Sequence, residues 1–152
     1  MLDETAASAL LAAARDAARA AYAPYSGFAV GAAILTADGT IVTGCNVENA
    51  SYPLTMCGER VAVGSALAAG HRLIRAIALS TPAAPGGTPC GACRQVLNEF
   101  APPDDPMIVV LEGPDGPELV PLSALLPRSF GPRDLKRAGA GEPSSRQEVS
   151  DR

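Results

Sequence analysis

The sequence predicts an α/β fold, specifically a three-layer α-β-α sandwich around a mixed sheet of about five strands. Two observations favour this class. Short apolar runs of strand length alternate with segments of helical period, and the first two runs are joined by an Asp38-Gly39 turn. The turn predicts an antiparallel hairpin at the start of the sheet. The later strands are separated by helices, so we expect crossover connections of right-handed sense.

The individual elements are separated by glycine and proline. Helices are expected over residues 3–21, 57–69 and 91–100, with a short helical turn over 122–126. Pro24, Gly70 and the Pro102-Pro103 pair mark the ends of the three longer helices, since proline disrupts a helix and glycine favours its last turn. Strands are expected over 29–36, 40–45, 73–80, 107–111 and 118–120.

The length of 152 residues fits one domain with one core. We expect this domain to span residues 1–131. The composition becomes polar and small after Pro132, which predicts a mobile C-terminal tail over 132–152.

Charge and hydropathy exclude several classes of function. The chain has 12 basic and 16 acidic residues, a net charge of −4, which disfavours binding to nucleic acid. No apolar run approaches the ~20 residues of a membrane helix, and no signal peptide is visible. The expected location is the cytoplasm. Thiols stay reduced there, so clustered cysteines more often bind metal or take part in chemistry than form disulfides.

Three cysteines have the spacing of a metal site. Cys57 precedes one predicted helix, and Cys90 and Cys93 form a C-x-x-C at the start of another. A helix N-terminus stabilises the thiolate that zinc requires. Three protein ligands leave a fourth position open for water, as in catalytic zinc sites. If Cys45 were a fourth ligand, the site would be structural and the chain a non-catalytic, zinc-stabilised module. A redox role for the C-x-x-C leaves Cys57 unexplained.

Glu59 favours the catalytic interpretation. It follows Cys57 by two residues, where its charge would be repelled by three thiolates. The first turn of a helix accepts a glutamate in any protein, so the position alone decides little. A hydrolytic zinc enzyme, however, needs a proton carrier beside the water. The pattern C-x-E followed by P-C-x-x-C is the known signature of zinc-dependent deaminases.

The chain resembles the small homotetrameric zinc-dependent cytidine deaminases over roughly residues 8–131. The segments that carry the resemblance are Tyr25-Ser26-Gly27-Phe28, Val30-Gly31-Ala32-Ala33, Gly44 to Pro53, Cys57-Gly58-Glu59-Arg60, Pro89 to Gln95, and Leu125-Leu126-Pro127 with Phe130. The zinc segments occur in many deaminases, whereas Asn46-Val47-Glu48-Asn49 is more specific to enzymes that act on nucleosides.

The resemblance implies a cytidine deaminase-like fold and hydrolytic deamination of cytidine or deoxycytidine in pyrimidine salvage. It also implies one Zn²⁺ per chain, held by Cys57, Cys90 and Cys93, with Glu59 as the catalytic acid and base. A homotetramer with sites shared between subunits is expected. The positions that match the family's substrate-binding residues are Phe28, Asn46, Val47, Glu48, Tyr52, Gly58 and Phe130.

Within that set, Phe28 matches a residue that packs on the pyrimidine, and Asn46 and Glu48 match residues that bind the ribose hydroxyls. Tyr52 and Phe130 match residues that reach a neighbouring subunit's site. The family usually has alanine where this chain has Gly58, whose backbone groups serve there.

Arg60 is predicted to hydrogen-bond a ligating sulfur, because three thiolates leave zinc with a net negative charge that must be offset. A blasticidin-type nucleoside deaminase is the alternative enzyme, since it shares the zinc segments. Deamination of a base in a polynucleotide is disfavoured by the acidic body. The sequence does not decide between cytidine and deoxycytidine.

Overall fold

The computed structural model of the chain describes residues 2–137. Its strands are β1 (Gly31–Thr36), β2 (Ile41–Cys45), β3 (Ile74–Ser80), β4 (Ile108–Gly113) and β5 (Gly116–Pro121). Its helices are α1 (Glu4–Ala18), α2 (Gly58–Ala68), α3 (Gly91–Glu99), α4 (Leu122–Leu125) and α5 (Pro132–Arg137), with a 3-10 turn over Tyr52–Leu54.

The strands form one mixed sheet in the order β2-β1-β3-β4-β5. β1 and β2 are the predicted antiparallel hairpin, and Gly39 takes a φ of 89° in its turn. β3 lies antiparallel to β1 and parallel to β4, and β5 closes the far edge antiparallel to β4. The prediction of a mixed, five-stranded α/β fold is therefore confirmed.

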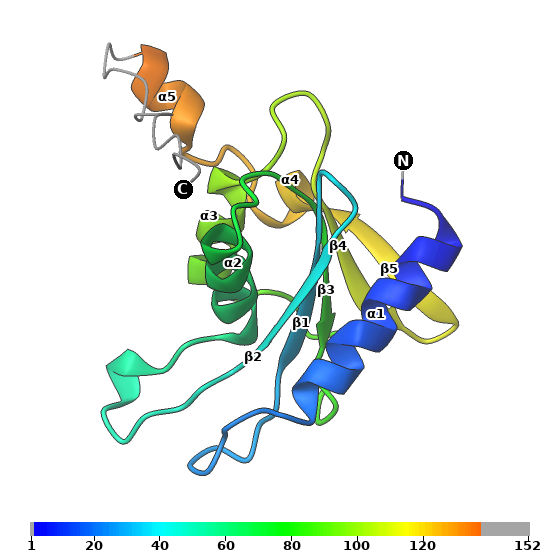
Figure 1. Ribbon diagram of the computed structural model, residues 1–152, viewed down its shortest axis with the longest axis vertical. Coiled ribbons are helices and arrows are strands. Elements are labelled where there is room, and N and C mark those ends of the chain that lie inside the picture. Colours follow the sequence, from blue (N-terminus) through cyan, green and yellow to red (C-terminus); the bar gives the residue numbers. More distant parts are fainter. Residues whose placement is uncertain (1, 138–152) are drawn as a thin grey trace, which may run out of the picture.

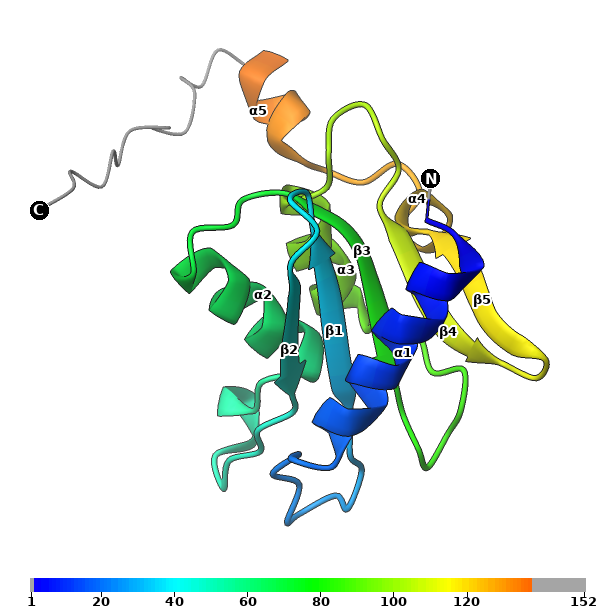
Figure 2. The same ribbon diagram turned by 45° about the vertical axis from the view of Figure 1, so that its right-hand side comes forward.

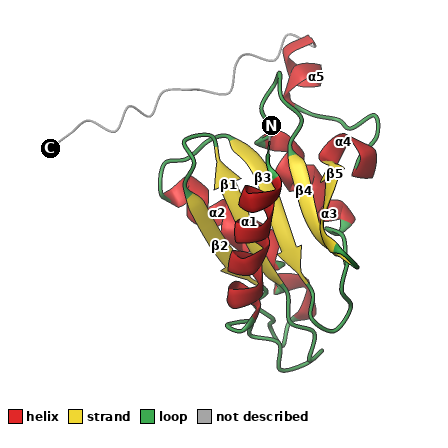
Figure 3. Ribbon diagram, turned by 90° about the vertical axis from the view of Figure 1, so that its right-hand side faces the viewer, coloured by secondary structure: helices red, strands yellow, loops and turns green. Residues whose placement is uncertain are grey.

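Helices cover both faces of this sheet, as Figures 1 and 3 show. α1 packs its Leu10 and Ala14 against one face, where alternate residues of β1 and β3 are small alanines. α2 and α3 pack on the opposite face against the larger Ile34, Ile77 and Val109. Because alternate residues of a strand point to opposite faces, the same strands contribute side chains to a hydrophobic cluster on each face of the sheet.

Two glycines let helices approach the strands closely. A Cβ on Gly31 would lie 2.0 Å from the carbonyl oxygen of Ala14 in α1. A Cβ on Gly44 would lie 2.4 Å from the backbone nitrogen of Ala62 in α2. Because both neighbours are helix backbone, a side chain at either position would force the helix away from the sheet. Gly44 thus fixes α2 beside the strand that leads into the Asn46–Glu48 segment.

Several element boundaries differ from the predictions by one to three residues, and two of the differences are informative. α1 ends at Ala18 rather than at residue 21, because Tyr22 pairs in a β-bridge with Val47 and the chain must leave the helix to reach it. β5 is longer than predicted, since it pairs with β4 as far as Gly113.

The predicted C-terminal tail begins with structure. Its first six residues form α5, and the backbone nitrogen of Gly131 donates to the carboxylate of Asp134 at 2.8 Å. Residues 138–152, for which mobility is predicted, lie outside the described part of the chain. Figure 2 shows α5 at the end of the chain, beyond α4.

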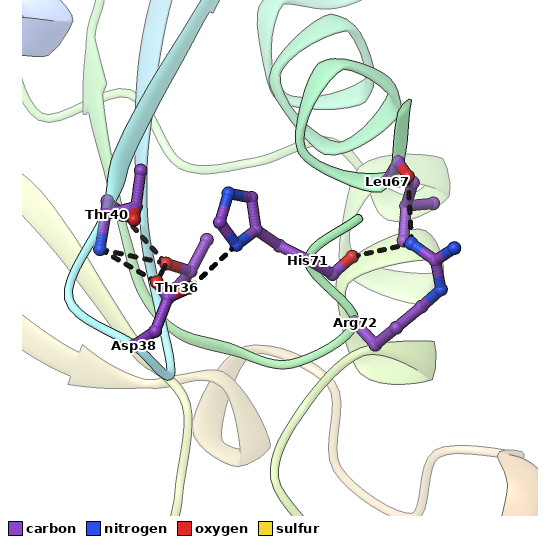
Figure 4. A network of polar contacts seen from close by, with 6 residues as sticks. All are labelled: Thr36, Asp38, Thr40, Leu67, His71 and Arg72. Atoms are coloured by element: carbon purple, nitrogen blue, oxygen red, sulfur yellow. Dashed lines mark hydrogen bonds and ion pairs between the residues drawn. The ribbon is translucent and has the colours of Figure 1, made fainter. Parts of the chain in front are cut away.

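His71, the one histidine of the sequence, is mostly covered. Its side chain is 19% exposed, and its Nδ1 lies 3.0 Å from the carboxylate of Asp38 in the β1–β2 turn (Figure 4). Asp38 in turn accepts a hydrogen bond from the hydroxyl of Thr36. The pair therefore connects the turn of the hairpin to the segment that follows α2.

Among residues 2–137, no helix has both the length and the apolar character that a membrane crossing requires.

Candidate metal centre and active site

Two helix starts bring three cysteines together. Cys57 is the N-terminal cap of α2, Cys90 is the cap of α3, and Cys93 lies in the first turn of α3. Their sulfur atoms all lie within 4.8 Å of one another, although 32 residues separate the first from the second in the chain. Free backbone N–H groups at both helix starts favour negative charge on the sulfurs.

The donor set fits zinc. Zn²⁺ binds thiolates at about 2.3 Å, so sulfurs at the corners of a tetrahedron stand about 3.8 Å apart. A cluster within 4.8 Å contracts to that spacing with small side-chain rotations. Cys93 is buried, Cys57 is half-buried and Cys90 is exposed, so the cluster is open to solvent on one side. Three ligands with an open side match the catalytic type of zinc site.

Cys45 stands apart from this cluster. Its thiol donates a hydrogen bond to the backbone carbonyl of Ala20 at 3.3 Å, at the end of β2. Among the described residues, the group of potential metal ligands contains Cys57, Cys90 and Cys93 alone. The arrangement therefore does not support the closed, four-cysteine site of the zinc-stabilised module.

Hydrogen bonding distributes charge unevenly within the cluster. The hydrogen bond from Cys93 is the main cause that lowers the pKa of Cys57 to about 5, and Arg60 contributes. The same hydrogen bond, together with burial, raises the pKa of Cys93.

Glu59 lies next to the cluster in the first turn of α2, and it is only 4% exposed. Burial is the main cause that raises its pKa above the ordinary value, and the charge of Cys57 adds to it. A carboxyl group with a raised pKa keeps its proton more readily than an ordinary glutamate, which suits a group that must accept and donate protons. A buried carboxyl beside a metal-binding group is the arrangement that a hydrolytic zinc enzyme requires.

Arg60, in the same helical turn, also interacts with Cys57. It lowers the pKa of Cys57 through its charge and as a hydrogen-bond donor. Its Nη2 donates to the carbonyl oxygen of Thr55 at 2.8 Å. Its Nε is buried and has no hydrogen-bond partner among the described residues.

The residues expected to bind substrate lie in two loops that contact each other. Asn46 is buried, and its amide donates to the carbonyl of Phe28 at 2.9 Å and accepts from the N–H of Val30 at 2.8 Å. Glu48 accepts from the backbone N–H groups of Tyr25 and Ser26 at 2.9 and 3.2 Å. Both side chains thus serve the loop structure in addition to any role toward a ligand.

The other members of the predicted set are distributed around these loops. Val47 is 43% exposed, and its backbone exchanges two 2.9 Å hydrogen bonds with Met56, just before the metal centre. The Phe28 ring is 38% exposed. Gly58 is buried, and a Cβ there would lie 3.0 Å from the carbonyl oxygen of Val30. An alanine at this position would need a small shift of that carbonyl.

A hollow of about 280 Å³ opens between the two loops. Its lining consists of Tyr25, Ser26, Glu48, Tyr52 and Thr55. The rings of Tyr25 and Tyr52 lie 5.9 Å apart at a tilt of 57°. A larger hollow of about 650 Å³ lies near Arg15 and Glu112, and none of the residues predicted from the sequence lines it.

Phe130 lies far along the chain on a segment held by α3. The side chains of Gln95 and Asn98 both donate to its carbonyl oxygen, at 3.0 and 3.1 Å. Arg94 binds three groups of the surrounding chain: the carbonyls of Pro89 and Leu125 and the hydroxyl of Thr88. The helix that starts with Cys90 therefore also fixes the C-terminal segment, and the 61% exposed ring of Phe130 points outward.

Sequence reasoning did not identify several of these contacts. Ser26, Thr55 and Asn98 carry no pattern of their own, and their partners are 22, 5 and 32 residues away. The available signal for Ser26 was its place just before Gly27 and Phe28 in the segment that carries the family resemblance.

Comparison with known proteins gives consistent matches. Residues 4–109 match the family model described as the cytidine and deoxycytidylate deaminase zinc-binding region. A cytidine deaminase of Sporosarcina psychrophila is 43% identical over 130 residues, which cover 85% of this chain and 94% of that protein. A cytidine deaminase of Mycobacterium tuberculosis is 44% identical over 124 residues, covering 82% and 89%.

Solved structures agree with the sequence matches. The crystal structure of a cytidine deaminase from Burkholderia pseudomallei superposes with a TM-score of 0.73 at 48% identity, covering 80% of this chain and 97% of that one. The cytidine deaminase of Mycobacterium tuberculosis gives a TM-score of 0.70 at 43% identity, covering 81% and 95%.

Proposed function

Because the chain belongs to the cytidine and deoxycytidylate deaminase family, we propose that Cys57, Cys90 and Cys93 hold its zinc ion and that Glu59 transfers the protons. The protein is a zinc-dependent enzyme that converts cytidine or deoxycytidine and water into uridine or deoxyuridine and ammonia. The observation that supports this residue assignment is the convergence of three sulfurs within 4.8 Å beside a buried glutamate.

The reaction needs a water molecule activated at neutral pH and a carrier for its protons. A bound zinc ion supplies the Lewis acidity that lowers the pKa of water. Glu59 accepts a proton from the attacking water and donates it to N3 of the pyrimidine. It then takes the proton of the new hydroxyl group on C4 and passes it to the amino group, which departs as ammonia. Burial of Glu59 supports this role, because it raises the pKa of the carboxyl group and so favours the protonated form that must donate.

The nucleoside is bound by the two loops that meet beside the metal centre. The exposed ring of Phe28 packs against the pyrimidine, and Glu48 accepts from a ribose hydroxyl. Asn46 uses one amide hydrogen on Phe28 and one lone pair on Val30, and an amide group retains a second of each for the sugar. Val47 and Gly58 contribute backbone groups to the same nucleoside-binding site.

Exposed aromatic residues support a homotetramer with shared sites. Tyr52 is 71% exposed and Phe130 61% exposed, so both rings are available to contact a neighbouring subunit. In the assembly, both reach the site of a neighbouring subunit. We further infer a cytoplasmic enzyme of pyrimidine salvage with residues 1–131 as a single domain. Light scattering after size exclusion should give the mass of four chains.

The decisive experiment follows the ultraviolet absorbance of cytidine mixed with the purified protein, before and after treatment with a zinc chelator. We expect the cytidine band to disappear, the chelated protein to be inactive, and added zinc to restore the rate. Glu59→Gln should keep zinc and melting temperature while losing at least about 10³-fold in kcat, since general acid–base catalysis contributes that order.

Substantial activity in Glu59→Gln would remove the assignment of Glu59. If the wild-type protein carried one zinc ion per chain and left cytidine unchanged, blasticidin-type nucleosides would be the next substrates to test.

A further inference from the structure

Ser26 connects two of the residues assigned to nucleoside binding. Its hydroxyl donates a hydrogen bond to Oε1 of Glu48. The hydroxyl oxygen of Ser26 also accepts a hydrogen bond from the backbone N–H of Phe28 at 2.9 Å. One side chain therefore links the carboxylate of one loop to the backbone of the other.

The second carboxylate oxygen is held by the same loop. Oε2 of Glu48 accepts from the N–H groups of Tyr25 and Ser26 at 2.9 and 3.2 Å. The hydrogen bond from Ser26 is the main cause that lowers the pKa of Glu48, so the carboxylate stays ionised. Both oxygens are thus fixed before any ligand arrives.

Phe28 is held from its other side by Asn46, whose amide donates to the Phe28 carbonyl at 2.9 Å. Ser26 holds the N–H and Asn46 holds the C=O, so the backbone of Phe28 cannot rotate freely. Gly27, between Ser26 and Phe28, takes a φ of 67°, which a glycine adopts without strain. The result is a tight turn that presents the Phe28 ring and the Glu48 carboxylate in a fixed relation.

The donor inventory defines how Ser26 acts. A serine hydroxyl has one hydrogen, and Glu48 receives it. Oε2 of Glu48 already accepts twice, whereas Oε1 accepts once and keeps a site for one more donor. Ser26 therefore holds Glu48, which keeps an acceptor site and lines the hollow together with Tyr25, Ser26, Tyr52 and Thr55.

We propose that Ser26 is a positioning residue for deamination: its hydroxyl links the Glu48 carboxylate to the Phe28 backbone, so that both residues are held in place before the nucleoside binds. The proposal rests on the proposed function, in which Phe28 and Glu48 bind the nucleoside. Preorganisation reduces the ordering cost of binding. Loss of the hydroxyl therefore weakens substrate binding and leaves the chemistry at Glu59 intact.

The first test compares three variants at this position. Ser26→Ala keeps the two backbone donors on Glu48 and removes the hydroxyl, so KM for cytidine should rise about tenfold with kcat within about threefold, as expected for a hydrogen bond to a charged group. Ser26→Thr keeps the hydroxyl and should restore KM to within about threefold. Ser26→Cys is similar in size but has a poor donor, so its KM should lie between those of Ser26→Ala and Ser26→Thr. Ser65→Ala, on the exposed side of α2, is the matched control.

A double-mutant cycle with Glu48→Gln tests whether Ser26 acts through Glu48. If it does, Ser26→Ala should add less than about twofold to KM in the Glu48→Gln background, because the two residues act as a unit. Full tenfold additivity, an unchanged KM in Ser26→Ala, or a loss confined to kcat would each overturn the proposal. Zinc content and melting temperature are measured for every variant, and Ser26→Thr reports on the hydroxyl even if Ser26→Ala folds poorly.

Single variants of Phe28 and Glu48 separate this proposal from the assignment of those two residues to nucleoside binding. If Phe28→Ala and Glu48→Gln leave KM unchanged, the nucleoside-binding assignment fails. If those variants raise KM and Ser26→Ala does not, only the role of Ser26 is refuted.

Discussion

Nη2 of Arg60 donates a 2.8 Å hydrogen bond to the carbonyl oxygen of Thr55, two residues before Cys57. The guanidinium is thereby fixed beside the metal centre, with its Nε buried and without a partner among the described residues. A half-buried cation with an unused donor next to a thiolate offsets part of the negative charge that three sulfurs bring. The contact with Thr55 also anchors the loop that lines the hollow near Glu48.

We predict that Arg60→Ala slows turnover more than it weakens zinc binding. The expected loss in kcat is about 10- to 100-fold, the usual effect of removing a residue that supports a metal ligand. Zinc per chain, measured by mass spectrometry, should stay near one. Arg19→Ala is a suitable control, because the Arg19 side chain is 82% exposed on the opposite face. Unchanged turnover in Arg60→Ala would refute the role.

Cys45 gives a second prediction, because its thiol donates to the carbonyl of Ala20 rather than toward the metal cluster. Cys45→Ala should bind one zinc ion per chain and deaminate cytidine within about twofold of the wild-type rate. Loss of one hydrogen bond should lower stability by about 1 kcal/mol. Cys90→Ala, as the comparison, should lose most of its zinc. Zinc loss in Cys45→Ala would instead indicate a fourth ligand.

The features predictable from the sequence are those that depend on local period and on helix starts. Alternation of strands and helices predicts the sheet, and Cys57 and Cys90 each stand at a predicted helix start, where the structure has them. Side-chain pairs between distant loops are different. The position of His71 just after Gly70 gives no sign of its contact with Asp38, which is 33 positions away in the chain. The Ser26–Glu48 contact was missed for the same reason, since periodicity describes one element at a time.

Asp38 should make the stability of the fold depend on pH. The hydrogen bond from Thr36 is the main cause that lowers its pKa below the ordinary value of 3.8, and His71 contributes through charge. A depressed pKa in the folded state stabilises the protein above the unfolded pKa, and this contribution is lost as the pH falls. Urea unfolding of wild type and Asp38→Asn should therefore differ most above about pH 4 and converge below it. A difference that is constant from pH 7 to pH 3 would contradict this expectation.

Two glycines near the active site should respond to alanine in opposite directions. A Cβ on Gly44 would lie 2.4 Å from the backbone nitrogen of Ala62 in α2. Gly64 lies in the same helix and is exposed. Apart from its chain neighbours and the backbone of its own helix, no atom lies within 4 Å of a Cβ placed there. Gly44→Ala must push α2 off the sheet, so we expect a loss of at least about 3 kcal/mol in the free energy of unfolding.

Gly64→Ala should instead gain about 0.5–1 kcal/mol, because alanine is the better helix former and meets no clash. Chemical denaturation of both variants with zinc bound measures the two changes. Because α2 begins with Cys57, displacement of the helix in Gly44→Ala should also lower zinc content, whereas Gly64→Ala should keep it. Equal stability of the two variants would mean that α2 does not depend on the close approach at Gly44 for its position.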